Sequence, residues 1–315
     1  MFNKNLVVAA ALAFATGGAA AQYPIKNVTL VTHSSPGGGS DVFLRSLAKH
    51  LGPKMGVNFA VENVSGGSGA RAMARVAQAP ADGSVLYATT PTYIQTTLLS
   101  KPSHGYTALA PVVNVFLDPE VIYTRTESPH KTLADAVAHA KANPGKQRWG
   151  AANPASLERI AMERLNRLVG ARAVIVSHEG GGDLMIGVLN GTYDLGVGEM
   201  QEVRSQLEAK KVRLLGVLTD KRVGELGELR TAKEQGIDLV VTKFRGLAGP
   251  KGLPANVLKA WDDGIKAVLA DPTYRSEYTR EGLLPAFMSH EEAGPFTAKF
   301  ASELAASLRE LGLVK

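Results

Sequence analysis

The 315-residue sequence contains no cysteine. This absence excludes disulfide bridges, thiol catalysis, cysteine-bound zinc and iron–sulfur clusters, and it excludes a lipid anchor on an N-terminal cysteine. A chain of this length without disulfides must rely on its hydrophobic cores for stability.

Long apolar runs are also absent, except near the N-terminus. There, Lys4 precedes an apolar run at residues 6–15, and two glycines and three alanines follow, ending at Ala21. An apolar run of about ten residues is half of what a bilayer crossing requires. The order of basic, apolar and small residues predicts a secretory signal peptide at residues 1–21, with a buried N-terminal helix as the alternative. We expect the mature chain to be soluble and located in the periplasm.

Motifs for nucleotides and metals are lacking as well. No Gly-Lys-Ser/Thr follows the glycine run at residues 37–39, which argues against a Walker-type phosphate loop. After the glycine run at 66–69, the next strand ends in Thr89 and Thr90, where a dinucleotide site would place an acidic residue. The seven histidines lack the paired spacing of a helical zinc site. We therefore predict no cofactor and no metal.

One serine lies in a partial catalytic motif. Gly66 and Ser68 match part of the nucleophile elbow of serine hydrolases, but Ala70 stands where that motif requires glycine. No aspartate and histidine are placed by any visible rule to complete a triad. The chain is therefore predicted not to be an enzyme, and an exported serine hydrolase using Ser68 is kept as an alternative.

The charge balance is weakly positive. The chain has 35 Lys and Arg against 29 Asp and Glu, a net +6 that becomes +5 when Lys4 leaves with the signal peptide. This excess favours anionic ligands only mildly. The densest basic run, residues 210–213, is expected at the solvated C-terminal end of a helix, so no nucleic-acid partner is predicted.

Strand-like and helix-like segments alternate along the chain, which is typical of α/β domains. The 294 residues after the signal peptide exceed what one core usually stabilises, so two domains are predicted. The expected strands are residues 28–32, 59–62, 85–88, 148–151, 174–177 and 193–197. The expected helices are residues 41–51, 69–78, 133–142, 156–169 and a helix ending at Leu189.

Two extended segments, residues 121–125 and 240–245, are expected to cross between the domains. They divide the chain into a first lobe of residues 22–123 plus 243–315 and a second lobe of residues 124–242. After the return crossing only helices are expected, at about 255–270 and 289–312, packed on the first lobe. Two lobes joined by two crossings form a clamshell.

The sharpest local feature is the run from Pro36 to Asp41, which contains three consecutive glycines between a strand and a helix. Glycines expose backbone N–H groups, and a helix N-terminus carries partial positive charge, so this junction favours a carboxylate or a phosphate. A plain strand-to-helix turn capped by Ser40 or Asp41 is the alternative.

Several further short motifs follow one another along the chain, and their order, together with the glycine run, resembles that of one family. They are Tyr23-Pro24, Pro36 to Asp41, Val61-Glu62-Asn63 before Gly66-Gly67, Pro80-x-Asp82-Gly83, Ala142 to Lys146, Gly180-Gly181, Thr231 to Gly236, and Arg245-Gly246 followed by Gly249-Pro250. This order resembles the periplasmic binding components of tripartite tricarboxylate transporters, also called Bug proteins.

The resemblance implies a type II periplasmic binding protein fold. It also implies a small organic carboxylate, such as a di- or tricarboxylate or an aromatic acid, held in the cleft mainly by backbone groups and water and passed to membrane transporter subunits. Carried over residue by residue, the first-lobe wall would comprise Ser34, Ser35, Gly37, Gly38, Gly39, Ser40, Asp41, Thr89 and Thr90. The second lobe would contribute Asn153, Ala155, Ser156, Gly180, Gly181 and Glu199.

The sequence departs from the family pattern at two places. Ser34-Ser35 replaces an apolar or aromatic pair, and residues 151–155 replace a glycine-rich stretch, so a more polar or more hydrated ligand is expected. Glu199 is unexpected, because an ionised carboxylate would repel a bound anion. A ligand-sensing partner of a membrane receptor remains a further alternative to transport.

Overall fold

The computed structural model describes residues 23–178, 180–310 and 312–314. The predicted signal peptide at 1–21 lies outside the described residues. Within them, no helix has the length and the apolar character that crossing a bilayer would require.

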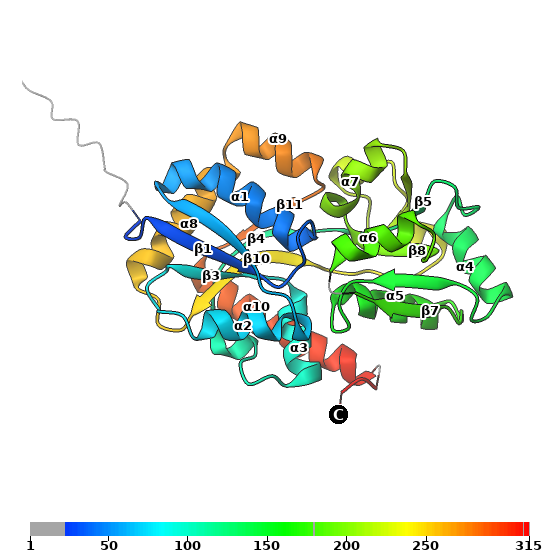
Figure 1. Ribbon diagram of the computed structural model, residues 1–315, viewed down its shortest axis with the longest axis horizontal. Coiled ribbons are helices and arrows are strands. Elements are labelled where there is room, and N and C mark those ends of the chain that lie inside the picture. Colours follow the sequence, from blue (N-terminus) through cyan, green and yellow to red (C-terminus); the bar gives the residue numbers. More distant parts are fainter. Residues whose placement is uncertain (1–22, 179, 311, 315) are drawn as a thin grey trace, which may run out of the picture.

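The chain forms two lobes, each built on one sheet, and Figure 1 shows them side by side. The first sheet has the order β11-β4-β10-β3-β1-β2. Its strands are β1 (Asn27–Thr32), β2 (Asn58–Asn63), β3 (Val85–Thr89), β4 (Leu109–Leu117), β10 (Phe244–Pro250) and β11 (Leu284–Met288). The second sheet, β7-β6-β8-β5-β9, contains β5 (Glu120–Arg125), β6 (Arg148–Ala151), β7 (Val174–Ser177), β8 (Leu195–Glu199) and β9 (Val212–Val217).

The two sheets share one feature of strand order and direction. Each contains an antiparallel strand that is the first to follow a crossing: β5 lies between β8 and β9, and β10 lies between β3 and β4. The remaining pairs at the centre of each lobe, such as β1 with β3 and β6 with β8, are parallel. The two-lobed α/β clamshell with two crossings is thereby confirmed.

Helices cover both faces of the first sheet. Figure 1 shows α1 and α9 on one face and α2, α3 and α10 on the other. The first-lobe helices are α1 (Gly39–Met55), α2 (Ala70–Ala77), α3 (Pro91–Ser100), α8 (Ala255–Leu269), α9 (Pro272–Arg280) and α10 (His290–Glu310). Those of the second lobe are α4 (Leu133–Ala142), α5 (Leu157–Leu168), α6 (Gly181–Leu189) and α7 (Met200–Glu208).

Each lobe has apolar cores of its own. Trp261 on α8 packs with strand residues such as Leu30 and Leu86 in the first lobe, and Trp149 on β6 lies at the centre of a core in the second. Both tryptophans are fully buried. Since burying a large side chain contributes about 1.5–3 kcal/mol, these cores stabilise a chain that lacks disulfides.

Several expected boundaries shift in the structure. The predicted division at residues 123 and 124 falls inside β5, whose pairing with β8 already begins at Glu120, so the sheets separate nearer residues 118 and 119. Helix α1 continues past Gly52 and Pro53, because the glycine that ends it is Gly56, which adopts the left-handed conformation with φ 65°.

The expectation of helices alone after the return crossing was wrong. Residues 284–288 form β11, which pairs with β4 at the edge of the first sheet. Pro285 obscured this strand in the sequence, because proline lacks the N–H that a central strand needs and is confined to edges and bulges.

Candidate functional site

Both lobes contribute to one cavity between them, at the carboxyl ends of strands β1, β3, β6 and β8, where ligands bind in open α/β sheets. The first lobe lines it with His33, Ser34, Gly39, Ser40, Thr90 and Thr92. The second lobe adds Ala152, Asn153, Glu158, Gly180, Gly181, Glu199 and Glu202, and the return crossing adds Lys243. The free space amounts to about 20 Å³, enough for a water molecule but not for an organic acid.

The glycine loop of the first lobe is held in shape by its own aspartate. The backbone N–H of Gly37 donates a hydrogen bond of 3.0 Å to Asp41, whose carboxylate also bonds Arg45 and Asn63. Asp41 is buried and does not line the cavity. Its role is to fix the turn that starts α1.

A second glycine run, at the start of α6, meets this loop from the opposite lobe. A side chain added at Gly180 would collide with Ser35, and one added at Gly182 would collide with the carbonyl oxygen of Pro36. The two lobes therefore touch through backbone, which only glycine allows at this distance.

Glu202 on α7 reaches across the cleft to the first lobe. Its Oε1 accepts the backbone N–H of Gly39, the first residue of α1, at 2.7 Å. Its carboxyl group also lies so close to Gly181 that a side chain there would overlap it. Burial, and then the charge of Glu199, raise the pKa of Glu202 well above its ordinary range.

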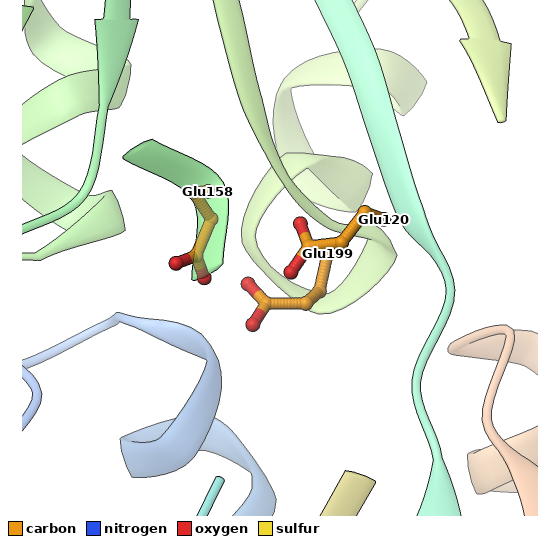
Figure 2. A group of neighbouring side chains, drawn as sticks. All are labelled: Glu120, Glu158 and Glu199. Carbon is orange, nitrogen blue, oxygen red and sulfur yellow. The ribbon is translucent and has the colours of Figure 1, made fainter. Parts of the chain in front are cut away.

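Lys243 lies among three buried carboxylates from the second lobe. Its Nζ is 3.0 Å from Glu120 on β5, and it also contacts Glu158 on α5 and Glu199 at the end of β8. Figure 2 shows how these carboxyl groups converge from three separate elements. Burial acts to lower the pKa of Lys243, but the three glutamates raise it well above its ordinary value, so the ammonium remains charged.

The same three carboxylates have the spacing of a metal site, since they offer oxygens within 4.8 Å of one another. The ammonium of Lys243 contacts all three. It therefore supplies the positive charge that a divalent cation would bring.

Arg245, at the start of β10, connects the charged cluster to the glycine loop. Its guanidinium donates to Asp118 at 2.7 Å, to the Ser40 hydroxyl at 2.7 Å and to Glu199 at 2.6 Å. Burial acts to raise the pKa of Glu199, but Lys243 and Arg245 lower it to about 2. Burial raises the pKa of Asp118 to about 6 despite Arg245. The unexpected Glu199 is thus neutralised by two buried cations.

His33 lies beside the loop as a neutral group. Its Nδ1 is 2.8 Å from the Tyr87 hydroxyl, and burial lowers the pKa of His33 to about 4. Thr90 caps α3 by accepting the N–H of Thr92 at 3.3 Å. These groups give the first-lobe wall a polar, uncharged surface.

The structure brings about half of the predicted site residues into the cavity lining. These are Ser34, Gly39, Ser40, Thr90, Asn153, Gly180, Gly181 and Glu199. The others are not part of the lining: Ser35, Gly37, Gly38, Asp41, Thr89, Ala155 and Ser156. Ser156, for example, caps α5 by accepting the N–H of Arg159 at 3.1 Å.

The charged lining residues other than Glu199 were missed in the sequence. Glu158 and Glu202 lie on helices, and Lys243 lies within the extended segment 240–245, so no motif distinguishes them from surface charges. A signal was present at the crossings, because Asp118 and Glu120 flank the outward one and Lys243 and Arg245 the return. Charged residues inside otherwise apolar extended segments need partners when buried.

Ser68 does not line the cavity. It lies in a short 3-10 turn with φ 53°, and its carbonyl oxygen accepts the Thr96 hydroxyl at 2.6 Å. Among the hydrogen bonds of the described residues, none joins Ser68 to a histidine.

The fold and the interlobe site define a type II periplasmic binding protein. The sequence profile of the family described as "Tripartite tricarboxylate transporter family receptor" matches residues 43–313. The chain therefore belongs to this family, as its motifs indicated.

Individual relatives agree with this assignment. Protein BugT of Bordetella pertussis is 23% identical over 322 residues, covering 99% of each chain. The structure of periplasmic binding protein BugD superimposes with a TM-score of 0.84 at 26% identity, covering 93% of this chain and 100% of that one.

Two structures from Rhodopseudomonas palustris share the fold at lower identity. Rpa4515 with adipate has a TM-score of 0.87 at 24% identity, covering 93% of this chain and 99% of that one. MatC with bound malate has a TM-score of 0.81 at 22% identity, covering 93% of this chain and 100% of that one.

Proposed function

We propose that this chain, exported to the periplasm after loss of residues 1–21, captures a small organic carboxylate between its lobes and delivers it to membrane transporter subunits. The observation that carries the proposal is the pair of helix N-termini, α1 at Gly39 and α6 at Gly181, that face one cavity from opposite lobes. Their backbone N–H groups and partial positive charges favour a bound anion.

The charged cluster is compatible with a bound anion. Glu199 contacts both Lys243 and Arg245, Lys243 also contacts Glu158, and burial keeps the pKa of Glu120 well above its ordinary value. Since Arg245 also pairs with Asp118, the cluster has no surplus positive charge, so a ligand with one or two carboxylates suits it better than one with three, whose charge nothing further would offset. The adipate of Rpa4515 and the malate of MatC, both dicarboxylates, support this choice.

A thermal-shift screen of the purified mature chain tests the proposal. Mono-, di- and tricarboxylates and aromatic acids would be compared with sugars, amines and metal ions. An acid present at 100 times its Kd should stabilise the protein by about 2.7 kcal/mol. Stabilisation by sugars, amines or metals with none by any acid would refute carboxylate capture.

A matched pair of variants locates the binding site. Gly181→Val should abolish the acid-dependent shift in melting temperature, because the valine side chain would fill the space at the N-terminus of α6 where the acid is proposed to bind. Gly294→Ala on α10 should retain the shift, since a side chain there meets nothing within 4 Å.

The hydrolase and sensor alternatives have their own tests. Generic esters would be assayed with wild type and Ser68→Ala, and activity lost in the variant would favour the hydrolase.

Uptake of the labelled acid would be measured in cells lacking the gene. Loss of uptake, restored by wild type but not by Gly181→Val, supports delivery, whereas unchanged uptake favours sensing.

A further inference from the structure

The position best suited to a ligand carboxylate is filled by the protein itself. The carboxyl group of Glu202 accepts the N–H of Gly39 at the start of α1 and lies against Gly181 at the start of α6. It thus lies between the two helix N-termini that face each other across the cleft. These are the groups that favour an anion.

The small volume of the cavity also indicates that a protein side chain fills the ligand position. The closed site keeps only about 20 Å³ of free space, so an organic acid cannot enter unless a side chain leaves. Lys243 and Arg245 are almost fully buried and tied to several carboxylates, whereas Glu202 is partly exposed. Glu202 therefore already reaches solvent, which makes it better placed to move than the two buried cations.

The ionised form of Glu202 is disfavoured at this position. Its neighbour Glu199 carries a negative charge that two cations stabilise, and burial together with this charge disfavours an ionised Glu202. Glu202 is therefore a neutral carboxyl group here, which gains less from the two helix N-termini than an ionised ligand carboxylate would. Its link to Gly39 nevertheless joins α7 of the second lobe to α1 of the first.

Building on the proposed function, we infer that Glu202 is an intramolecular substitute for the ligand: its carboxyl group holds the empty cleft closed, and the carboxylate of the ligand displaces it. Glu202 then sets affinity and selectivity, because every ligand competes with it. A ligand binds only if its carboxylate makes better use of the α1 and α6 N-termini than Glu202 does.

Acetate is the probe that tests this inference, because it reproduces the end of the removed side chain. In Glu202→Ala without ligand, the Gly39 amide should exchange with solvent about tenfold faster than in wild type, as expected when one hydrogen bond to a carboxyl group is lost. Acetate should restore slow exchange in Glu202→Ala and change little in wild type. Scattering in solution should show an expanded unliganded Glu202→Ala that contracts with acetate.

Two variants serve as controls. Glu208→Ala removes an exposed glutamate from the same helix and should behave as wild type. Glu202→Gln keeps the shape and the acceptor oxygen, and should bind acetate more weakly than Glu202→Ala because the side chain still fills the site. Equal Gly39 exchange in wild type and Glu202→Ala, or an equal acetate response in both, would overturn the inference.

The acetate readout separates this inference from the proposed function. If the acid screen on wild type fails while acetate still protects Gly39 in Glu202→Ala, capture of a carboxylate is wrong and the closing role of Glu202 stands. If natural acids bind but Glu202→Ala binds them less tightly than wild type, Glu202 is a ligand contact and the competing role is wrong.

Discussion

The two halves of the cleft are built in different ways. The glycine-loop half, residues 34–41 with the start of α6, offers backbone N–H groups and close contacts that only glycine permits. The charged half, around Lys243 and Arg245, consists of buried basic and acidic side chains from four separate parts of the chain. The comparison teaches that one cleft can combine locally encoded helix N-termini with a charged cluster that only long-range folding assembles.

The largest effect should come from breaking the charged half. Lys243→Met leaves Glu120, Glu158 and Glu199 buried without their shared ammonium, which should lower the free energy of unfolding by about 3–5 kcal/mol. Urea unfolding measures this loss. Lys259→Met, at an exposed lysine, is the control and should change stability little. A loss no larger than that of the control would show that the cluster is not a stabilising unit.

A substitution in the glycine-loop half should lower the free energy of unfolding by a smaller amount. A side chain at Gly39 would meet the Arg245 guanidinium and the Glu199 carboxylate, so Gly39→Ala should destabilise the protein by about 1–3 kcal/mol. Gly294→Ala, near the start of α10 where an added side chain meets nothing within 4 Å, should be neutral or slightly stabilising. Equal unfolding midpoints for the two variants would mean that the loop does not depend on close approach.

The third effect depends on pH and concerns Asp118 in the charged half. Burial raises the pKa of Asp118 from 3.8 to about 6, so its contribution to stability is present below about pH 3.8 and is lost as the pH rises through about 6. The stability of wild type relative to Asp118→Asn should therefore fall between pH 4 and pH 7, by up to about 3 kcal/mol. Urea midpoints across this range measure it; a constant difference would contradict the shift.

Much of the fold could be predicted because it is encoded locally. Helix α4 and strands β6 and β7 occupy the predicted residues, and a capping box of Thr132 and Asp135 starts α4. The segments at 91–100 and 109–117 were not predicted as α3 and β4, and Pro285 concealed β11. Alternation of short apolar segments fixed the α/β class, but it could not reveal every element.

What the sequence alone determined was the class of protein, the two glycine-rich helix starts and the family. What only the tertiary structure decided was the charge environment between them. Glu202 bonds Gly39 across 163 residues, and Lys243 meets carboxylates on β5, α5 and β8 only because the chain crosses twice between the lobes. Backbone conformation follows from neighbouring residues, whereas the pairing of buried charges depends on distant elements, so the sequence indicated the two helix N-termini but not the glutamate that lies between them.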